Sequence, residues 1–166
     1  MTTVFRIVRL IALAIWVGGL VFFGFVAAVA FKTLPDAHSA GAVVRGSLIA
    51  LHQIGLVAGV VYLLFTMALL ATQRDSHPMR AGELLLVILM MVLTGYSALS
   101  IIPRMEADRT SLGGDVTKAD ADAPALIHFN HLHKLSVRVE GAVLICGLLL
   151  LGLAPIHGRD DFDRFA

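Results

Sequence analysis

Long uncharged hydrophobic runs dominate the chain and predict helices that cross a membrane. Three of them meet the length of about 20 residues that a helix needs to span a hydrocarbon core of about 30 Å, and they occupy residues 10–31, 46–73 and 84–103. A fourth run, residues 141–156, is shorter, so its helix must begin about a turn earlier, which brings Arg138 and Glu140 to the membrane boundary. We therefore predict an all-α fold, a four-helix transmembrane bundle with spans at residues 10–31, 46–72, 84–103 and 137–156.

Three polar segments connect the predicted helices, and the third is the longest. Residues 32–45 and 74–83 form the first two connections. Residues 104–133 form a predicted polar loop, in which "SLGGDVTKADADAP" has the composition of a flexible segment. Pro103 is expected to end the third helix, because proline cannot supply the N–H that continues a helix. At this length we expect a single integral membrane domain, residues 1–166.

The even number of spans determines which connections share a side of the membrane. Both termini lie with the second connection, and the first and third connections lie opposite. Lys and Arg are divided almost evenly between the two sides. Because the positive-inside rule weighs short loops and the first helix most, we predict cytoplasmic termini and a polar loop at the outer face.

Composition and charge narrow the classes of protein. Hydrophobic residues make up 58% of the chain and charged residues 15%, whereas a soluble domain has about 45–50% and about 25%. The net charge is +1 and Lys and Arg form no cluster, so nothing indicates a nucleic-acid partner. The single cysteine, Cys146, excludes an intrachain disulfide and a metal site built on several thiolates. The expected partner is therefore the lipid bilayer.

Polar side chains gather on the side of the first and third connections. His52 lies near the start of the second helix, inside an otherwise apolar run, and an ionisable residue within a membrane span is a functional candidate by default. Along the fourth helix, His133, Ser136 and Glu140 follow at i, i+3 and i+7, so they share one stripe. The polar cluster that we expect on this side consists of Arg104, Ser136, Arg138 and Glu140, together with the histidines.

Histidine is the residue type that makes a metal site conceivable here. Imidazole suits zinc, copper and haem iron, and the candidate ligands are His52, His133, His131 and His128. The spacing of "HFNHLH" is a weak signal, since it also occurs in loops that bind no metal. The cofactor hypotheses are copper, zinc or haem b, and no cofactor is the default expectation.

A purely structural interpretation competes with each of these hypotheses. Histidines at helix ends are often solvated or hydrogen-bonded, and long cationic side chains extend to lipid headgroups. Arg138 with Glu140 would form an ion pair that ties helices together. Arg104 would bind a lipid phosphate or pair with Glu140.

Small residues predict where the helices pack. Gly18 and Gly19 lie beside Trp16 in the first helix, and Gly55 and Gly59 are four residues apart in the second. Close approach of backbones at small residues drives association in lipid. We predict packing at these glycines, and the Gly55 and Gly59 face would also allow a homodimer.

Three stretches carry a resemblance to a known family: "LAIWVGGLVFFGFVAAVAFKTLP", "PRMEADRTSLGGDV" and "FNHLHKLSVRVEGAVLICGLLLLGLA". The chain resembles the bacterial membrane family catalogued as domain of unknown function 4149, and it is similar to the eukaryotic transmembrane protein 205 group. The resemblance implies a four-span membrane protein without an established enzymatic activity. The family pattern maps onto Trp16, Gly18, Gly19, Pro103, Arg104, His133 and Ser136.

Three functional hypotheses remain open at this point. The leading one is a non-enzymatic, multi-pass protein of the bacterial inner membrane that handles a metal ion or small molecule at the outer face. Its site would be formed by His52, Arg104, His133, Ser136 and Glu140. The alternatives are a haem- or metal-binding redox subunit and a structural subunit of a larger membrane complex.

Overall fold

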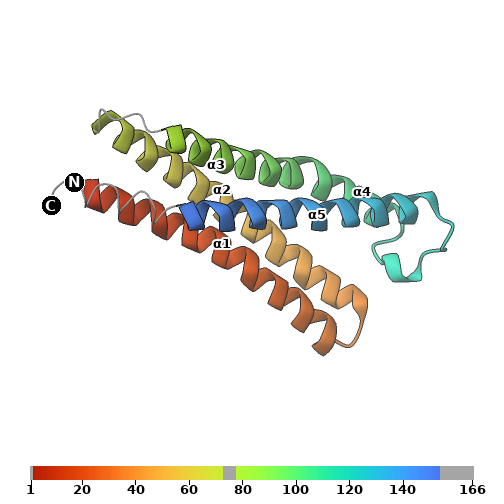
Figure 1. The fold of residues 1–166 in the computed structure, drawn as a ribbon. Coiled ribbons are helices and arrows are strands. Elements are labelled where there is room, and N and C mark those ends of the chain that lie inside the picture. Colours follow the sequence, from red (N-terminus) through yellow and green to blue (C-terminus); the bar gives the residue numbers. More distant parts are fainter. Residues whose placement is uncertain (1, 73–77, 154–166) are drawn as a thin grey trace.

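Four long helical segments form the molecule, as a computed structural model shows (Figure 1). It describes the backbone of residues 2–72 and 78–153 and, apart from residues 72 and 78–80, their side chains. The segments are α1 (Thr2–Thr33), α2 (Ala37–Thr72), a composite third helix and α5 (Pro124–Leu153). The third consists of α3 (Pro78–Tyr96), the π-helical turn η1 (Ser97–Ile101) and α4 (Ile102–Ser111). All four are long and apolar enough to cross a membrane, which confirms the predicted all-α, four-helix transmembrane bundle.

The third helix continues beyond Pro103, where the sequence predicted its end. Proline lacks an N–H, and its ring clashes with the carbonyl four residues earlier in a regular α-helix. The turn before it is widened instead, and the N–H of Ile102 donates to the carbonyl of Ser97, five residues back. The chain accommodates the proline through this π-turn and remains helical as far as Ser111.

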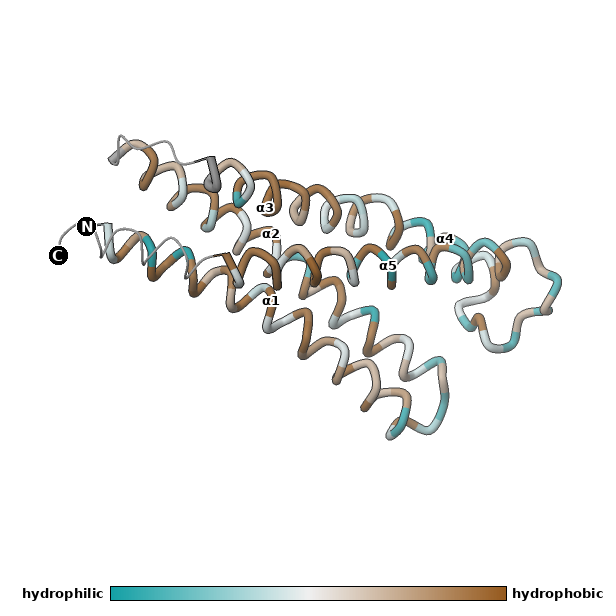
Figure 2. The backbone as a smooth tube through the Cα atoms, in the orientation of Figure 1, coloured by the Kyte–Doolittle hydropathy of each residue, from teal (hydrophilic) through white to brown (hydrophobic). Residues whose placement is uncertain are grey.

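The polar loop predicted for residues 104–133 is correspondingly much shorter. Gly113 and Gly114 have φ values of 76° and 90° and turn the chain away after α4. A short 3₁₀-helix, η2 (Val116–Lys118), follows, and α5 begins at Pro124 rather than near residue 137. The prediction was wrong because helices α4 and α5 extend past the apolar segments and include polar residues that the sequence analysis assigned to a loop (Figure 2). The predicted residues 154–156 of the fourth span lie outside the described residues.

The helices form two groups that separate toward one end. α1 and α2 pack along each other, and α5 packs on α3 and α4. The start of α1 and the end of α5 lie at the same end of the bundle (Figure 1). At the opposite end, which we call the loop end, the α1–α2 turn diverges from α4 and α5 (Figure 1). This divergence creates room between the two groups.

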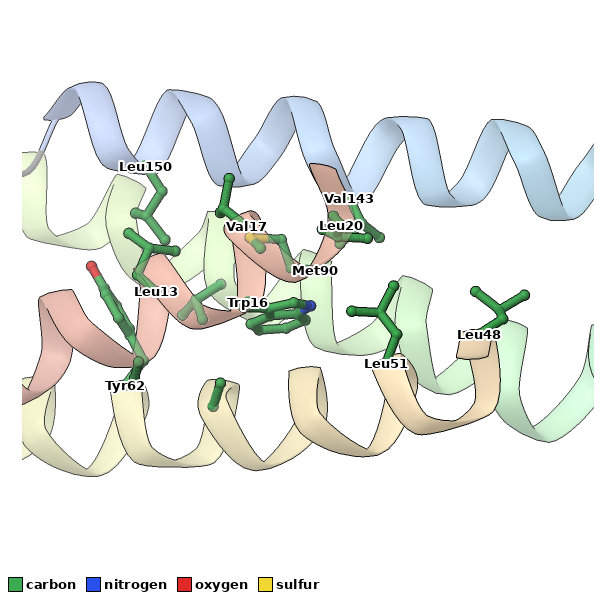
Figure 3. Close-up of a cluster of buried hydrophobic side chains, with 13 residues drawn as sticks. Leu13, Trp16, Val17, Leu20, Leu48, Leu51, Tyr62, Met90, Val143 and Leu150 are labelled. Carbon is green, nitrogen blue, oxygen red and sulfur yellow. The ribbon is translucent and has the colours of Figure 1, made fainter. Parts of the chain in front are cut away.

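Trp16 of α1 is the centre of the packed core (Figure 3). A Cβ atom added at Gly55 would overlap the Trp16 indole, and one at Gly59 would lie 2.7 Å from Cγ of Met91 and 2.8 Å from Cζ3 of Trp16. Gly19 similarly faces Leu51, at 2.9 Å from its Cδ1. Because Trp16 covers the Gly55 and Gly59 face inside the chain, that face is not open to the homodimer contact suggested by the sequence.

Gly18 does not serve the packing role predicted for it. It is exposed, and a Cβ atom added there would meet nothing within 4 Å. Gly147 of α5, which the sequence analysis did not single out, is in close contact instead. Its added Cβ would lie 2.5 Å from Cγ2 of Val17. Helix periodicity explains why Gly19 packs and Gly18 does not, because consecutive residues of a helix point about 100° apart.

Candidate functional site

A cavity of about 620 Å³ lies between the two helix groups at the loop end. α1, α2, α4, α5 and η2 all contribute to its lining. Most of its wall is apolar, with large side chains such as Phe23, Leu48 and Leu144. The cavity exists because α1 and α2 diverge from α4 and α5, so it follows from the arrangement of the helices rather than from any one of them.

A hydrogen-bonded histidine and glutamate lie at the wall of this cavity. His52 Nε2 of α2 is 2.7 Å from Glu140 Oε1 of α5, and only 4% and 12% of the two side chains is exposed. Glu140 lines the cavity, whereas His52 lies behind it. The second carboxylate oxygen, Oε2, is buried and has no hydrogen-bond partner among the described residues. This buried oxygen is therefore an unused acceptor in the wall that Glu140 helps to form.

The stripe that the sequence predicted on the fourth helix faces this cavity. His133, Ser136 and Glu140 all line it, and Ser136 is buried. The helical spacing brings the three residues to one face of α5. That face borders the cavity, with Ser136 buried and His133 exposed. A regular α-helix is sufficient to place His133, Ser136 and Glu140 on the same face.

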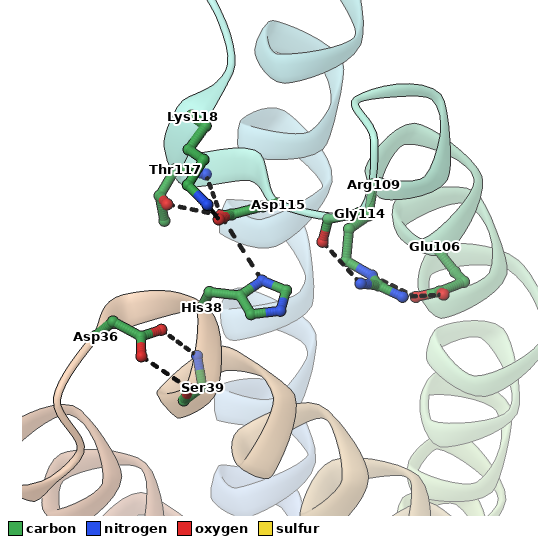
Figure 4. A network of polar contacts seen from close by, with 9 residues as sticks. All are labelled: Asp36, His38, Ser39, Glu106, Arg109, Gly114, Asp115, Thr117 and Lys118. Atoms are coloured by element: carbon green, nitrogen blue, oxygen red, sulfur yellow. Dashed lines mark hydrogen bonds and ion pairs between the residues drawn. The ribbon is translucent and has the colours of Figure 1, made fainter.

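Charged side chains line the cavity toward the loop end, and Figure 4 shows two of them, Glu106 and Arg109. The Glu106 carboxylate of α4 lies 2.6 Å from Arg45 Nη1 of α2 and 3.0 Å from Arg109 Nε. Arg109 also donates to the carbonyl oxygen of Gly114 at 2.8 Å. Glu106 is thus held by two guanidinium groups, and the one from Arg45 connects α2 to the third helix.

The loop after α4 also reaches α2 (Figure 4). His38 Nδ1 lies 3.7 Å from Asp115 Oδ1. The Thr117 hydroxyl and backbone N–H donate to the Asp115 carboxylate and, with help from Lys118, lower the pKa of Asp115 to about 2. Asp115 is therefore ionised at neutral pH and attracts His38 whenever that imidazole is protonated.

Four of the predicted site residues lie away from the cavity. His128 Nδ1 is 2.7 Å from Asp108 Oδ2 on the surface, and His131 is exposed. Arg104 and Arg138 are exposed and form no ion pair with a described residue, so neither pairs with Glu140 as the sequence suggested. Arg138 cannot share the face of Glu140, because two residues along a helix rotate the side chain by about 200°.

The candidate metal ligands lie in separate surroundings. Within residues 2–72 and 78–153, no three His, Cys, Asp or Glu side chains converge in a way that would hold a metal ion. His52 contacts Glu140, His128 contacts Asp108, and His133 faces the cavity. Among the described residues, these histidines are therefore not gathered around one point.

The sequence analysis missed a second buried charge pair, at the end opposite the cavity. Arg9 Nη1 lies 3.0 Å from Glu83 Oε2, with 10% and 1% of the two side chains exposed. The Arg9 guanidinium lies over the Tyr62 ring at 5.2 Å from its centroid. Arg9 and Glu83 both adjoin apolar runs on the same predicted side of the membrane, and that topology was the signal that could have paired them.

Comparison with known proteins gives one match. The model of a family described as "Domain of unknown function (DUF4149)" matches residues 11–110. This segment includes His52 and the residues of the cavity mouth on α2 and α4, and it ends before α5. No curated protein and no solved structure matches the chain.

Proposed function

The chain belongs to the DUF4149 family of membrane proteins, and from this premise we propose that it binds a small amphipathic organic molecule in the cavity at the loop end. One observation carries the proposal: the wall of an apolar cavity of about 620 Å³ includes Glu140, whose side chain is 12% exposed and whose Oε2 has no hydrogen-bond partner among the described residues. Its volume falls in the range of about 300–1,000 Å³ that is typical of small-molecule sites.

The polar lining residues Ser136 and Glu140 argue against a cavity that binds only hydrocarbon. Within a bilayer, an apolar molecule gains little by leaving lipid for an apolar cavity, because the two surroundings are alike. A molecule with a polar end gains more, because Glu140 and Ser136 offer hydrogen-bonding groups that lipid tails lack. The proposed ligand therefore combines an apolar body with a polar end that reaches Glu140.

The mouth of the cavity supports access from the aqueous side. Arg45, Glu106 and Arg109 surround it, and all three are at least partly exposed. If the termini are cytoplasmic, as the sequence predicts, this mouth opens at the outer face. The proposed function is then the binding or uptake of a small molecule from that face.

The test uses three probes with one apolar body and different polar ends: 1-adamantylamine, 1-adamantanol and 1-adamantanecarboxylate. Binding to the protein in lipid nanodiscs is measured by isothermal titration calorimetry, with empty nanodiscs as the blank. Gly141→Leu fills the cavity, since Gly141 lines it and an added Cβ meets nothing within 4 Å. Gly18→Leu is the matched control on an exposed face that is equally free of contacts.

We expect at least one probe to bind the wild-type protein, with affinity at least tenfold lower in Gly141→Leu and unchanged in Gly18→Leu. Fluorescence of Trp16, the single tryptophan, checks that both variants keep the packed core. The proposal fails if no probe binds, or if binding is the same in Gly141→Leu as in the wild-type protein.

A further inference from the structure

The His52–Glu140 pair can hold one proton without carrying a net charge. With one proton shared between the imidazole and the carboxylate, the pair is neutral overall, whichever atom holds it. Without that proton, the pair carries one negative charge. Its side chains are 4% and 12% exposed, and an uncompensated charge in such a setting is costly. The singly protonated pair is therefore the form that leaves no net charge buried.

A cationic ligand changes this balance. Glu140 faces the cavity, and its Oε2 is a buried acceptor without a hydrogen-bond partner among the described residues. A protonated amine in the cavity would lie beside this carboxylate and bring one positive charge. With the amine bound, the amine and the His52–Glu140 pair are neutral together only if the pair releases its proton to solvent.

From this geometry we infer, on the basis of the proposed function, that the cavity selects protonated amines and exchanges each for one proton held by His52 and Glu140. The step is balanced: a protonated amine plus the protonated pair gives the amine bound to the deprotonated pair plus one proton in solution. No bond to carbon changes, and no oxidant or reductant takes part. Cation binding and proton release are the same event at one carboxylate.

The other charged groups around the cavity leave Glu140 as the carboxylate for this exchange. α2 contributes His38 and Arg45, α4 contributes Glu106 and Arg109, α5 contributes His133, and α1 and η2 contribute no charged lining residue. The remaining lining carboxylate, Glu106, is already held by two guanidinium groups. An amine at the mouth would have to compete with both of them.

The experiment measures proton release directly in the wild-type protein. 1-Adamantylamine is titrated into the protein in nanodiscs at pH 7 in two buffers with different ionisation enthalpies, and the difference in heat gives the number of protons released. We expect close to one proton per amine bound, and none for 1-adamantanol. We also expect the amine to bind at least tenfold more tightly than the alcohol.

Two variants locate the effect. Glu140→Gln keeps the shape of the side chain and removes its charge, so the amine should lose its advantage over the alcohol and release no proton. Asp108→Asn is the matched control: it removes a carboxylate that also lies 2.7 Å from a histidine, His128, but does not line the cavity. Proton release and amine preference should persist in Asp108→Asn.

The outcomes separate the inference from the function on which it rests. If no probe binds, the proposed function fails. If amine and alcohol bind equally and Gly141→Leu weakens both, the cavity binds small molecules and the inference is overturned. Tighter binding of 1-adamantanecarboxylate, or amine binding without proton release, also overturns it. The wild-type heats decide the question even if Glu140→Gln does not fold.

Discussion

Separating His52 from Glu140 should destabilise the bundle more than breaking any exposed pair of the same geometry. The perturbation is a double-mutant cycle with His52→Ala, Glu140→Ala and the double variant. Removing one partner leaves the other buried and unsatisfied, which costs about 1–3 kcal/mol for a polar group. Because His52 is only 3% exposed, water cannot replace the partner that it loses in Glu140→Ala.

The structure allows the size of the coupling to be estimated. Interhelical hydrogen bonds in membranes average about 0.6 kcal/mol in such cycles and reach about 1.7 kcal/mol. The 2.7 Å contact and the burial of both side chains place this pair near the upper value. We expect single substitutions to cost about 2 kcal/mol each, with a coupling energy of roughly 1.5 kcal/mol.

The exposed pair His128–Asp108 is the control, since its distance is also 2.7 Å but the His128 side chain is 52% exposed. Its coupling should stay below about 0.5 kcal/mol, as for other exposed pairs. Unfolding by sodium dodecyl sulfate in mixed micelles, followed by Trp16 fluorescence, measures both cycles. Equal coupling in the two pairs, or none at His52–Glu140, would refute the argument that burial strengthens this contact.

Two further predictions concern packing and the loop. Gly55→Ala should destabilise the protein by about 1–3 kcal/mol relative to Gly46→Ala in the same unfolding assay, because its Cβ overlaps Trp16 whereas that of Gly46 meets nothing within 4 Å; equal stabilities would contradict this packing. The carboxyl carbon resonance of Asp115 should titrate with a midpoint near 2, so its stabilising contacts are present above about pH 4 and are lost as the pH falls toward 2. Thr117→Val should raise that pKa and Thr117→Ser should preserve it, and an unchanged midpoint in Thr117→Val would show that the hydroxyl is not the main cause.

Local pattern was sufficient for the features that depend on one helix at a time. The number of spans follows from uncharged runs of sufficient length, and the inward stripe on α5 follows from the spacing of His133, Ser136 and Glu140. A helix has a fixed rise and rotation per residue. Length and face can therefore be predicted before any neighbour is known.

Features that depend on contacts between helices needed the tertiary structure. The sequence analysis suggested Arg104 and Arg138 as partners of Glu140. In the structure, the partner of Glu140 is His52 of α2. The polar residues before α5 suggested a loop, but α4 and α5 pack on each other and remain helical. The π-turn before Pro103 likewise allows the helix to continue where a local rule predicted its end.

The sequence by itself determined that this is a multi-pass membrane protein and which residues share one face of its last helix. Only the tertiary structure decided that those residues line a cavity, that Glu140 meets His52, and that Arg9 meets Glu83 at the other end. The physical reason is that hydropathy and periodicity are properties of one segment. A cavity or a buried pair depends on the angle and depth at which two segments meet, and many residues distant in sequence determine that angle together.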